Sequence, residues 1–130
     1  MHNEFIAIIA AAVAAWIFGA IWYGLLGKAW QAAQGLAPGK GKKMPVTPMV
    51  ASFLCELLMA FVFSQLLISM GAIDWQSGAI TGLLLAIGFM VTIIIVNNLF
   101  QGRQWMLIFI DSGHWIGVAV IQGAVLTAML

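Results

Sequence analysis

Four long runs of apolar residues cover almost the whole chain, at about residues 5–26, 47–70, 77–100 and 104–130. The hydrocarbon core of a bilayer is about 30 Å thick, and one helix crosses it with about 20 apolar residues. Of the 130 residues, 64% are hydrophobic and only 7% are charged, whereas soluble domains carry roughly 25% charged residues. The sequence therefore predicts one membrane domain, 1–130, folded as an all-α, four-helix transmembrane bundle with up-down-up-down topology.

The basic residues predict how this bundle is oriented. They all lie in the segments that follow the first and third apolar runs: Lys28, Lys40, Lys42, Lys43 and Arg103. The opposite side carries only acidic side chains, Glu4 and Asp74. Because loops rich in Lys and Arg stay in the cytoplasm, residues 27–46 are predicted to form a basic cytoplasmic loop, with both termini outside. The first residues lack the basic segment of a signal peptide, so we expect a retained helix.

The basic loop is also the segment where a ligand-binding motif would be sought. Its lysines, Lys40, Lys42 and Lys43, lack the glycine spacing of a phosphate-binding loop, and no Ser or Thr follows Lys40. Basic side chains beside a membrane attract anionic lipids, so we expect lipid contacts at these positions. A net charge of only +1 excludes a nucleic-acid partner.

A short stretch at the end of the first run carries a family resemblance. Residues 19–30 read GAIWYGLLGKAW, in which a Gly-x-x-Trp-Tyr element leads to a Gly-Lys-x-Trp element. This stretch resembles the N-terminal signature of a bacterial membrane family catalogued as domain of unknown function 1761. The polar second run, Gly88-Phe89 in the third and the polar start of the fourth extend the resemblance. It implies four helices in a bacterial inner membrane and brings no activity.

Small residues predict where helices pack closely, because they let two backbones approach. The candidates recur at four-residue spacing within three of the runs: Gly19, Gly78, Gly82, Gly113 and Gly117. In the fourth run, the face bearing Gly113 and Gly117 lies nearly opposite the face bearing Asp111. Since a four-helix monomer would leave one of these faces to lipid, this arrangement predicts a homo-oligomer in which the face of Gly113 and Gly117 contacts another subunit.

Polar side chains inside the apolar runs gather in the half predicted to be cytoplasmic. They form a candidate site, with three further residues in supporting positions: Glu56, Asn97, Asn98, Asp111 and His114, supported by Tyr23, Lys28 and Gln122. Ionisable groups are costly in hydrocarbon, so they need partners in protein or water. If they form one site, side-chain atoms of Glu56 should lie within about 6 Å of Asp111 or His114, the range of strong electrostatic coupling.

Two functional interpretations of this cluster remain open. Glu56 and Asp111 could bind protons or cations, with His114 as a titrating partner, in a small ion- or solute-handling protein. Alternatively, the same groups could hydrogen-bond only to one another and lock the helices of a structural or accessory subunit. A metal site of Glu56, Asp111 and His114 lacks the His and Cys clustering typical of zinc, and no GxSxG motif favours an enzyme. We therefore expect no metal, cofactor or catalytic residue.

Overall fold

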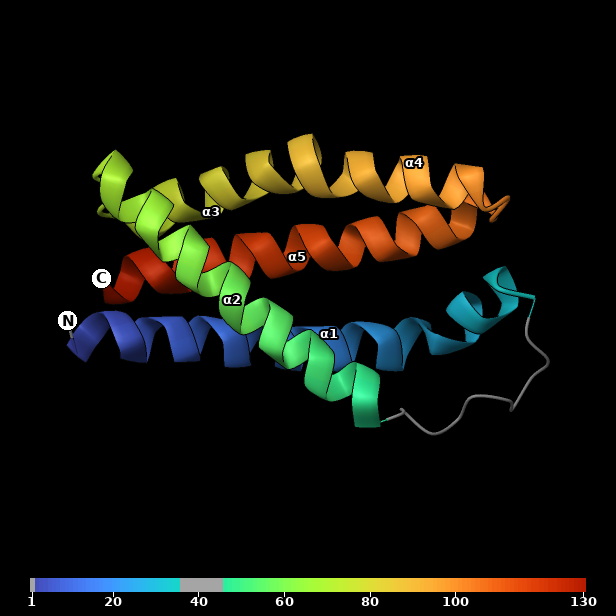
Figure 1. Cartoon of the computed structure of the whole chain (residues 1–130), viewed down its shortest axis with the longest axis horizontal. Helices are drawn as coiled ribbons and strands as arrows, with labels where there is room; N and C mark the ends of the chain where they lie inside the picture. The colour runs from blue at the N-terminus through green and yellow to red at the C-terminus, as the bar shows by residue number, and fades with distance from the viewer. Residues whose placement is uncertain (1, 36–45) are drawn as a thin grey trace.

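The computed structural model describes residues 2–35 and 46–130, and every regular element in these two ranges is helical (Figure 1). The predicted four-helix bundle is confirmed: four helical segments are long and apolar enough to cross a membrane. The elements, in chain order, are α1 (His2–Ala33), α2 (Val46–Met70), α3 (Trp75–Leu85), the π-helical turn η1 (Ala86–Val91), α4 (Thr92–Phe100) and α5 (Trp105–Met129). The protein is thus a multi-pass membrane protein by the length and composition of its helices.

Helix α1 is longer than its apolar run, which ends near residue 26. No proline interrupts residues 27–33, so the helix continues to Ala33 and the chain turns at Gly35, whose φ is +76°. With 32 residues, α1 is about 48 Å long and exceeds the roughly 30 Å of hydrocarbon. Figure 1 shows its last turns bending toward the start of α5. The three lysines assigned to lipid contacts, Lys40, Lys42 and Lys43, lie outside the described residues.

The third apolar run is one continuous span, Trp75–Phe100. Asp74 caps its start: the carboxylate accepts the backbone N–H of Ser77 at 2.7 Å. Hydrogen bonds from the side chain and then the backbone of Ser77 lower the pKa of Asp74. The π-helical turn in the middle was not predicted. Thr92, the first residue of α4, donates its hydroxyl hydrogen to the carbonyl of Gly88 in this turn at 3.0 Å.

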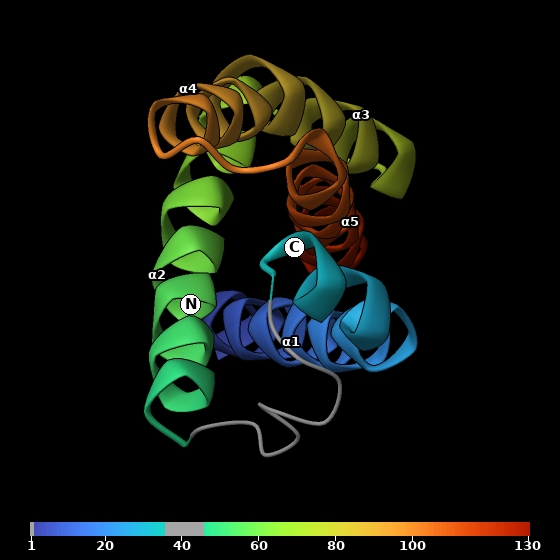
Figure 2. The same cartoon turned by 90° about the vertical axis from the view of Figure 1, so that its right-hand side faces the viewer.

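Helix α5 is the central element, enclosed by α1, α2 and α3 (Figure 2). Its contact with α3 is made backbone to backbone. A Cβ atom built on Gly78 would lie well under 3.0 Å from the carbonyl oxygen of Gly123, and one built on Gly82 would meet the carbonyl oxygen of Ala119. Only glycine therefore fits at these positions, because a side chain would push the two helices apart.

The opposite contact, between α5 and α1, corrects one prediction. A Cβ atom on Gly113 would lie 2.6 Å from the ring of Trp22, and one on Gly117 would collide with the ring of Phe18. The prediction that this face contacts another subunit is wrong, because aromatic side chains of α1 in the same chain fill it. The glycine face therefore no longer supports a homo-oligomer, which stays a prediction.

Candidate functional site

Two hydrogen bonds join the middle of α1 to the first turns of α5. The hydroxyl of Tyr23 donates to Oδ1 of Asp111 at 2.6 Å, and the indole Nε1 of Trp22 donates to the backbone carbonyl of Ile110 at 3.0 Å. Adjacent aromatic residues of α1 thus bond to adjacent residues of α5. The first bond gives the Asp111 carboxylate a short, directed donor inside the bundle, as a charged group in hydrocarbon requires.

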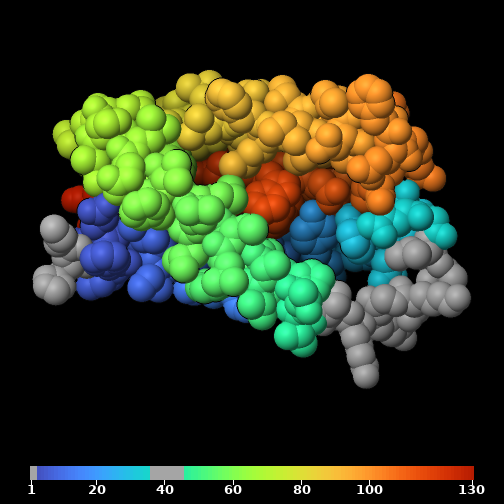
Figure 3. Space-filling view, in the orientation of Figure 1, coloured from blue at the N-terminus to red at the C-terminus, as the bar shows by residue number. Residues whose placement is uncertain are grey.

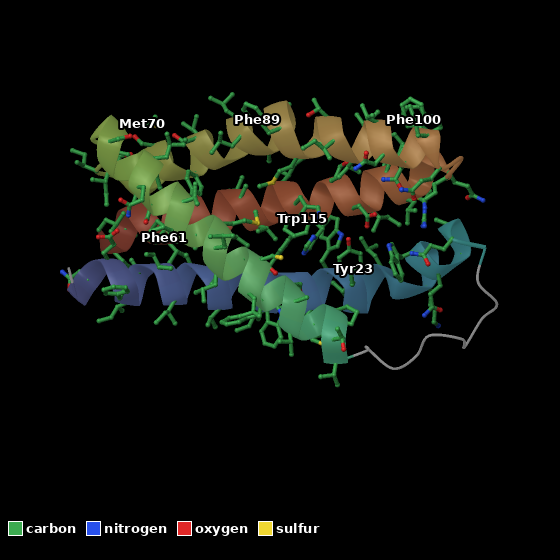
Figure 4. The ribbon with its side chains drawn as sticks, in the orientation of Figure 1. Tyr23, Phe61, Met70, Phe89, Phe100 and Trp115 are labelled. Atoms are coloured by element: carbon green, nitrogen blue, oxygen red, sulfur yellow. The ribbon has the colours of Figure 1, made fainter. Side chains whose placement is uncertain are left out.

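His114 lies one turn further along α5, among aromatic rings. Its ring centroid is 4.9 Å from that of Tyr23, 4.6 Å from that of Trp115 and 6.2 Å from that of Phe18, which is nearly parallel to it. Figure 4 shows the side chains that fill this space between α1 and α5. Gly19 makes room for the imidazole, since a Cβ atom there would lie 2.7 Å from Nε2. The ring therefore packs among aromatic side chains of α1 and α5.

The polar atoms of His114 are only partly satisfied. The side chain is 6% exposed, and within the described ranges its Nδ1 has no hydrogen-bond partner. A buried ring nitrogen of this kind normally donates or accepts a hydrogen bond. Nδ1 of His114 is therefore a buried polar atom whose hydrogen bond the described side chains do not supply.

Glu56 forms the next polar layer together with Gln122; it belongs to α2, the helix that runs across α1 and α5 (Figure 1). Its backbone carbonyl accepts the side-chain amide of Gln122 at 2.9 Å. The carboxyl group is 1% exposed, and its Oε1 has no hydrogen-bond partner among the residues that the structure describes. Gln122 stands eight residues after His114 on α5, so the two layers are about 12 Å apart along the helix axis.

The remaining members of the predicted site lie elsewhere. Asn98 donates to the carbonyl of Ile94 in its own helix at 2.8 Å, and the side chains of Asn97 and Lys28 are exposed. The structure thus brings Tyr23, Asp111 and His114 together and places Glu56 beside Gln122. Asn97 and Asn98 make no polar contact with either group within residues 46–130.

The possible metal site is not formed. In the described part of the chain, no group of three His, Cys, Asp or Glu side chains could hold a metal ion, so Glu56, Asp111 and His114 do not form one. Oε1 of Glu56 and Nδ1 of His114 are not bonded to each other, since within the same residues each lacks a partner. The distance of about 6 Å predicted between these groups stays a prediction.

Two aromatic residues of α1 that pack against this site are absent from the set predicted from the sequence. Phe18 and Trp22 were not selected, although their four-residue spacing places both on one helix face together with the small residue Gly19. Ser112 was also missed; it is 7% exposed, and its hydroxyl lacks a partner within the described ranges. The spacing of Phe18 and Trp22 was a usable signal, whereas nothing in the sequence separates Ser112 from other serines in apolar runs.

Comparison with known proteins adds a family and no activity. The family model described as "Protein of unknown function (DUF1761)" matches residues 6–127. Neither the comparison with curated proteins nor the comparison with solved structures gives a match. These comparisons therefore assign no activity to the polar side chains of the site.

Proposed function

Because this chain belongs to the DUF1761 family of proteins of unknown function, we propose from its geometry that it binds and passes protons. The protons would be carried by polar side chains at the junction of α1, α2 and α5. This proposal makes the protein a small ion-handling membrane protein, and it assigns the central steps to Glu56 and His114.

One observation carries the proposal. Glu56 and His114 are both more than nine-tenths buried, and each has a polar atom without a partner in the described part of the chain. A buried polar atom left unpaired costs about 1–3 kcal/mol, and more if the group is charged. A purely structural interior gains nothing from two such groups. A proton-binding site needs them, because each must be able to take up or release a proton.

Further polar groups extend from this pair toward both ends of the bundle. On the side predicted to be cytoplasmic, Tyr23 and Asp111 form the hydrogen-bonded pair beside His114. At the opposite end, the side-chain amide of Gln65 donates both to the carboxylate of Glu4 and to the hydroxyl of the buried Ser64. Protons would enter at one of these pairs and leave at the other.

The chemistry of the two central groups suits this task. A carboxyl group and an imidazole each exist in a protonated and an unprotonated form, and both groups are buried inside the bundle. Because Glu56 Oε1 and His114 Nδ1 are not directly bonded and belong to layers about 12 Å apart, transfer between them requires a chain of several waters. Intramembrane relays of Asp, Glu and His in pumps and transporters work in this way.

A structural or accessory role is the second candidate, and a specific pair of contacts favours it. The hydrogen bonds of Tyr23 to Asp111 and of Trp22 to Ile110 hold α1 against α5. If these hydrogen bonds only stabilise the packing of the helices, the polar side chains have a structural role and the protein conducts no protons.

Proton flux into liposomes separates the two candidates. The purified protein is reconstituted with a pH-sensitive dye inside the vesicles, and a potassium gradient with valinomycin sets the membrane potential. We expect the wild type to carry a flux that Glu56→Gln and His114→Gln abolish. Cys55→Ser is the matched control, because Cys55 precedes Glu56 in α2 and its side chain is exposed. No flux from the folded wild type would leave the structural role, and unchanged flux in Glu56→Gln would remove Glu56 from the path.

A further inference from the structure

A pocket beside the polar site, which shares Gln122 with the Glu56 layer, opens on the side of the bundle between α2 and the α3–η1 segment. Its volume is about 380 Å³, and its lining residues come from α2, α3, η1 and α5: Leu58, Met59, Val62, Phe63, Leu66, Leu85, Phe89, Met90, Ala119 and Gln122. Figure 3 shows the red to orange atoms of α5 at the floor of the hollow between α2 and the helices above it. Because it opens sideways within the spans, its entrance faces the acyl chains of the bilayer.

The lining is uncharged, and its only polar side chain is Gln122. This amide is 1% exposed and uses one of its two N–H hydrogens to bond the carbonyl of Glu56. No other hydrogen bond of the Gln122 side chain exists within the described residues. A fixed amide with spare donor and acceptor capacity in an apolar pocket is complementary to an uncharged polar group on an apolar body.

The volume of the pocket indicates the size of the molecule that it can hold. It lies in the range of about 300–1,000 Å³ that is typical of small-molecule sites. A single acyl-like chain is of the right size.

The depth of the polar group excludes a phospholipid head. Gln122 stands seven residues before Met129, the last residue of α5, which is about 10 Å from that end of the helix. A phosphate at this depth would be a charge in hydrocarbon, and that is costly. A hydroxyl group that hydrogen-bonds to the amide avoids most of this cost.

Two features of the wall suit a pocket that opens and closes. Met59 and Met90 are unbranched and flexible, and methionine side chains adapt to irregular ligands. Met90 and Phe89 belong to the π-helical turn Ala86–Val91, and such turns occur frequently at functional sites. The irregular segment of the third span is therefore the segment that forms this wall.

We propose that this pocket binds an uncharged, single-chain lipophile from the bilayer, a long-chain alcohol whose hydroxyl group bonds the side-chain amide of Gln122. The chain lies along the apolar lining contributed by α2 and η1. This site differs from the proton path, since none of its lining residues is ionisable.

Photolabelling of the whole protein in liposomes tests the proposal. The probe is hexadecanol carrying a diazirine in its chain and an alkyne for detection, and mass spectrometry locates the labelled peptides. We expect labelling of peptides that contain Met59 and Met90, which excess unlabelled hexadecanol suppresses. Gln122→Leu should lower labelling by about two- to tenfold, which is the effect of losing one net hydrogen bond. The remaining labelling should equal that of wild-type protein with a probe that has the same hydrocarbon chain but no hydroxyl group.

A variant pair in α2 provides the control. Val62→Trp places a large ring at the pocket entrance and should abolish the saturable labelling. Leu54→Trp lies eight residues earlier on the same helix, is similarly exposed and lies outside the lining, so its labelling should be unchanged. Equal labelling by phosphatidylcholine bearing the same diazirine chain, labelling that does not saturate, or unchanged labelling in folded Val62→Trp would each overturn the proposal.

Discussion

The hydroxyl of Tyr23 bonds the carboxylate of Asp111 over 2.6 Å, although the two residues are 88 positions apart in the chain. This bond joins the first span to the last and lies next to His114. Tyr23→Phe removes only the donor and leaves the carboxylate unpaired. We expect the free energy of unfolding to fall by about 1–2 kcal/mol, because a part-buried acceptor loses its partner.

A double-mutant cycle with Asp111→Leu isolates this interaction. In Asp111→Leu, the further change Tyr23→Phe should cost much less than it does in the wild type. Unfolding in mixed micelles with increasing denaturing detergent measures all four proteins. Equal costs in both backgrounds would show that the hydroxyl contributes nothing through Asp111.

The contact between α3 and α5 gives a second prediction. Gly78→Ala places a methyl group against the carbonyl oxygen of Gly123, so the helices must separate. We expect a loss of several kcal/mol, at or above the roughly 1–3 kcal/mol typical of overpacking. Gly24→Ala is the control, since a Cβ atom there meets nothing within 4 Å and alanine favours a helix by about 0.5–1 kcal/mol. Thermal unfolding that ranks these two variants in the opposite order would contradict the close packing.

The contact between α1 and α5 gives a third prediction, in place of the subunit contact expected from the sequence. Gly117→Ala should destabilise the monomer by about 1–3 kcal/mol, because its methyl group meets the ring of Phe18. Adding Phe18→Ala creates space for that methyl group, so the two changes together should cost less than the sum of their separate effects. Strictly additive costs, or a change of oligomeric state in Gly117→Ala without loss of stability, would argue for an intersubunit role.

The start of α3 carries a pH-dependent cap. Hydrogen bonds from the side chain and the backbone N–H of Ser77 hold the pKa of Asp74 below its ordinary value, so the cap is fully formed at pH values above that ordinary pKa. It is lost as the pH falls through the lower folded pKa. Hydrogen exchange at the Ser77 amide should therefore show additional opening in strong acid, and Asp74→Asn should remove this dependence. The same acid-induced opening in Asp74→Asn would show that another group is responsible.

Membrane orientation is the fifth prediction and depends on charge alone. Residues 27–46 should face the cytoplasm and both termini the outside. In a Cys55→Ala background, a membrane-impermeant thiol reagent should label Asp74→Cys in intact cells and Gln101→Cys only after the membrane is opened. Both positions lie at helix ends and are exposed. The reverse labelling pattern would invert the bundle and exchange the two ends of the proposed proton path.

The sequence alone was enough for the number of spans and for their helical form. Four apolar runs in a chain with 7% charged residues leave no other way to satisfy the backbone in hydrocarbon. The start of the third helix at Asp74 could also be expected, since a side chain that accepts the N–H of Ser77 is a local feature. The family was identified from residues 19–30, and the match over residues 6–127 confirms it.

Only the tertiary structure decided which polar groups meet. Periodicity places Gly113 and Gly117 on one face of a helix, but it does not say which neighbour that face meets, and the neighbour is α1. Likewise, residues in the same leaflet lie at the same depth in the membrane, but they can face different neighbouring helices. Asn98 therefore bonds within α4, while Asp111 bonds Tyr23. Depth follows from position along each run, whereas side-chain partners depend on helix rotation and crossing, which the packing of all four spans sets together.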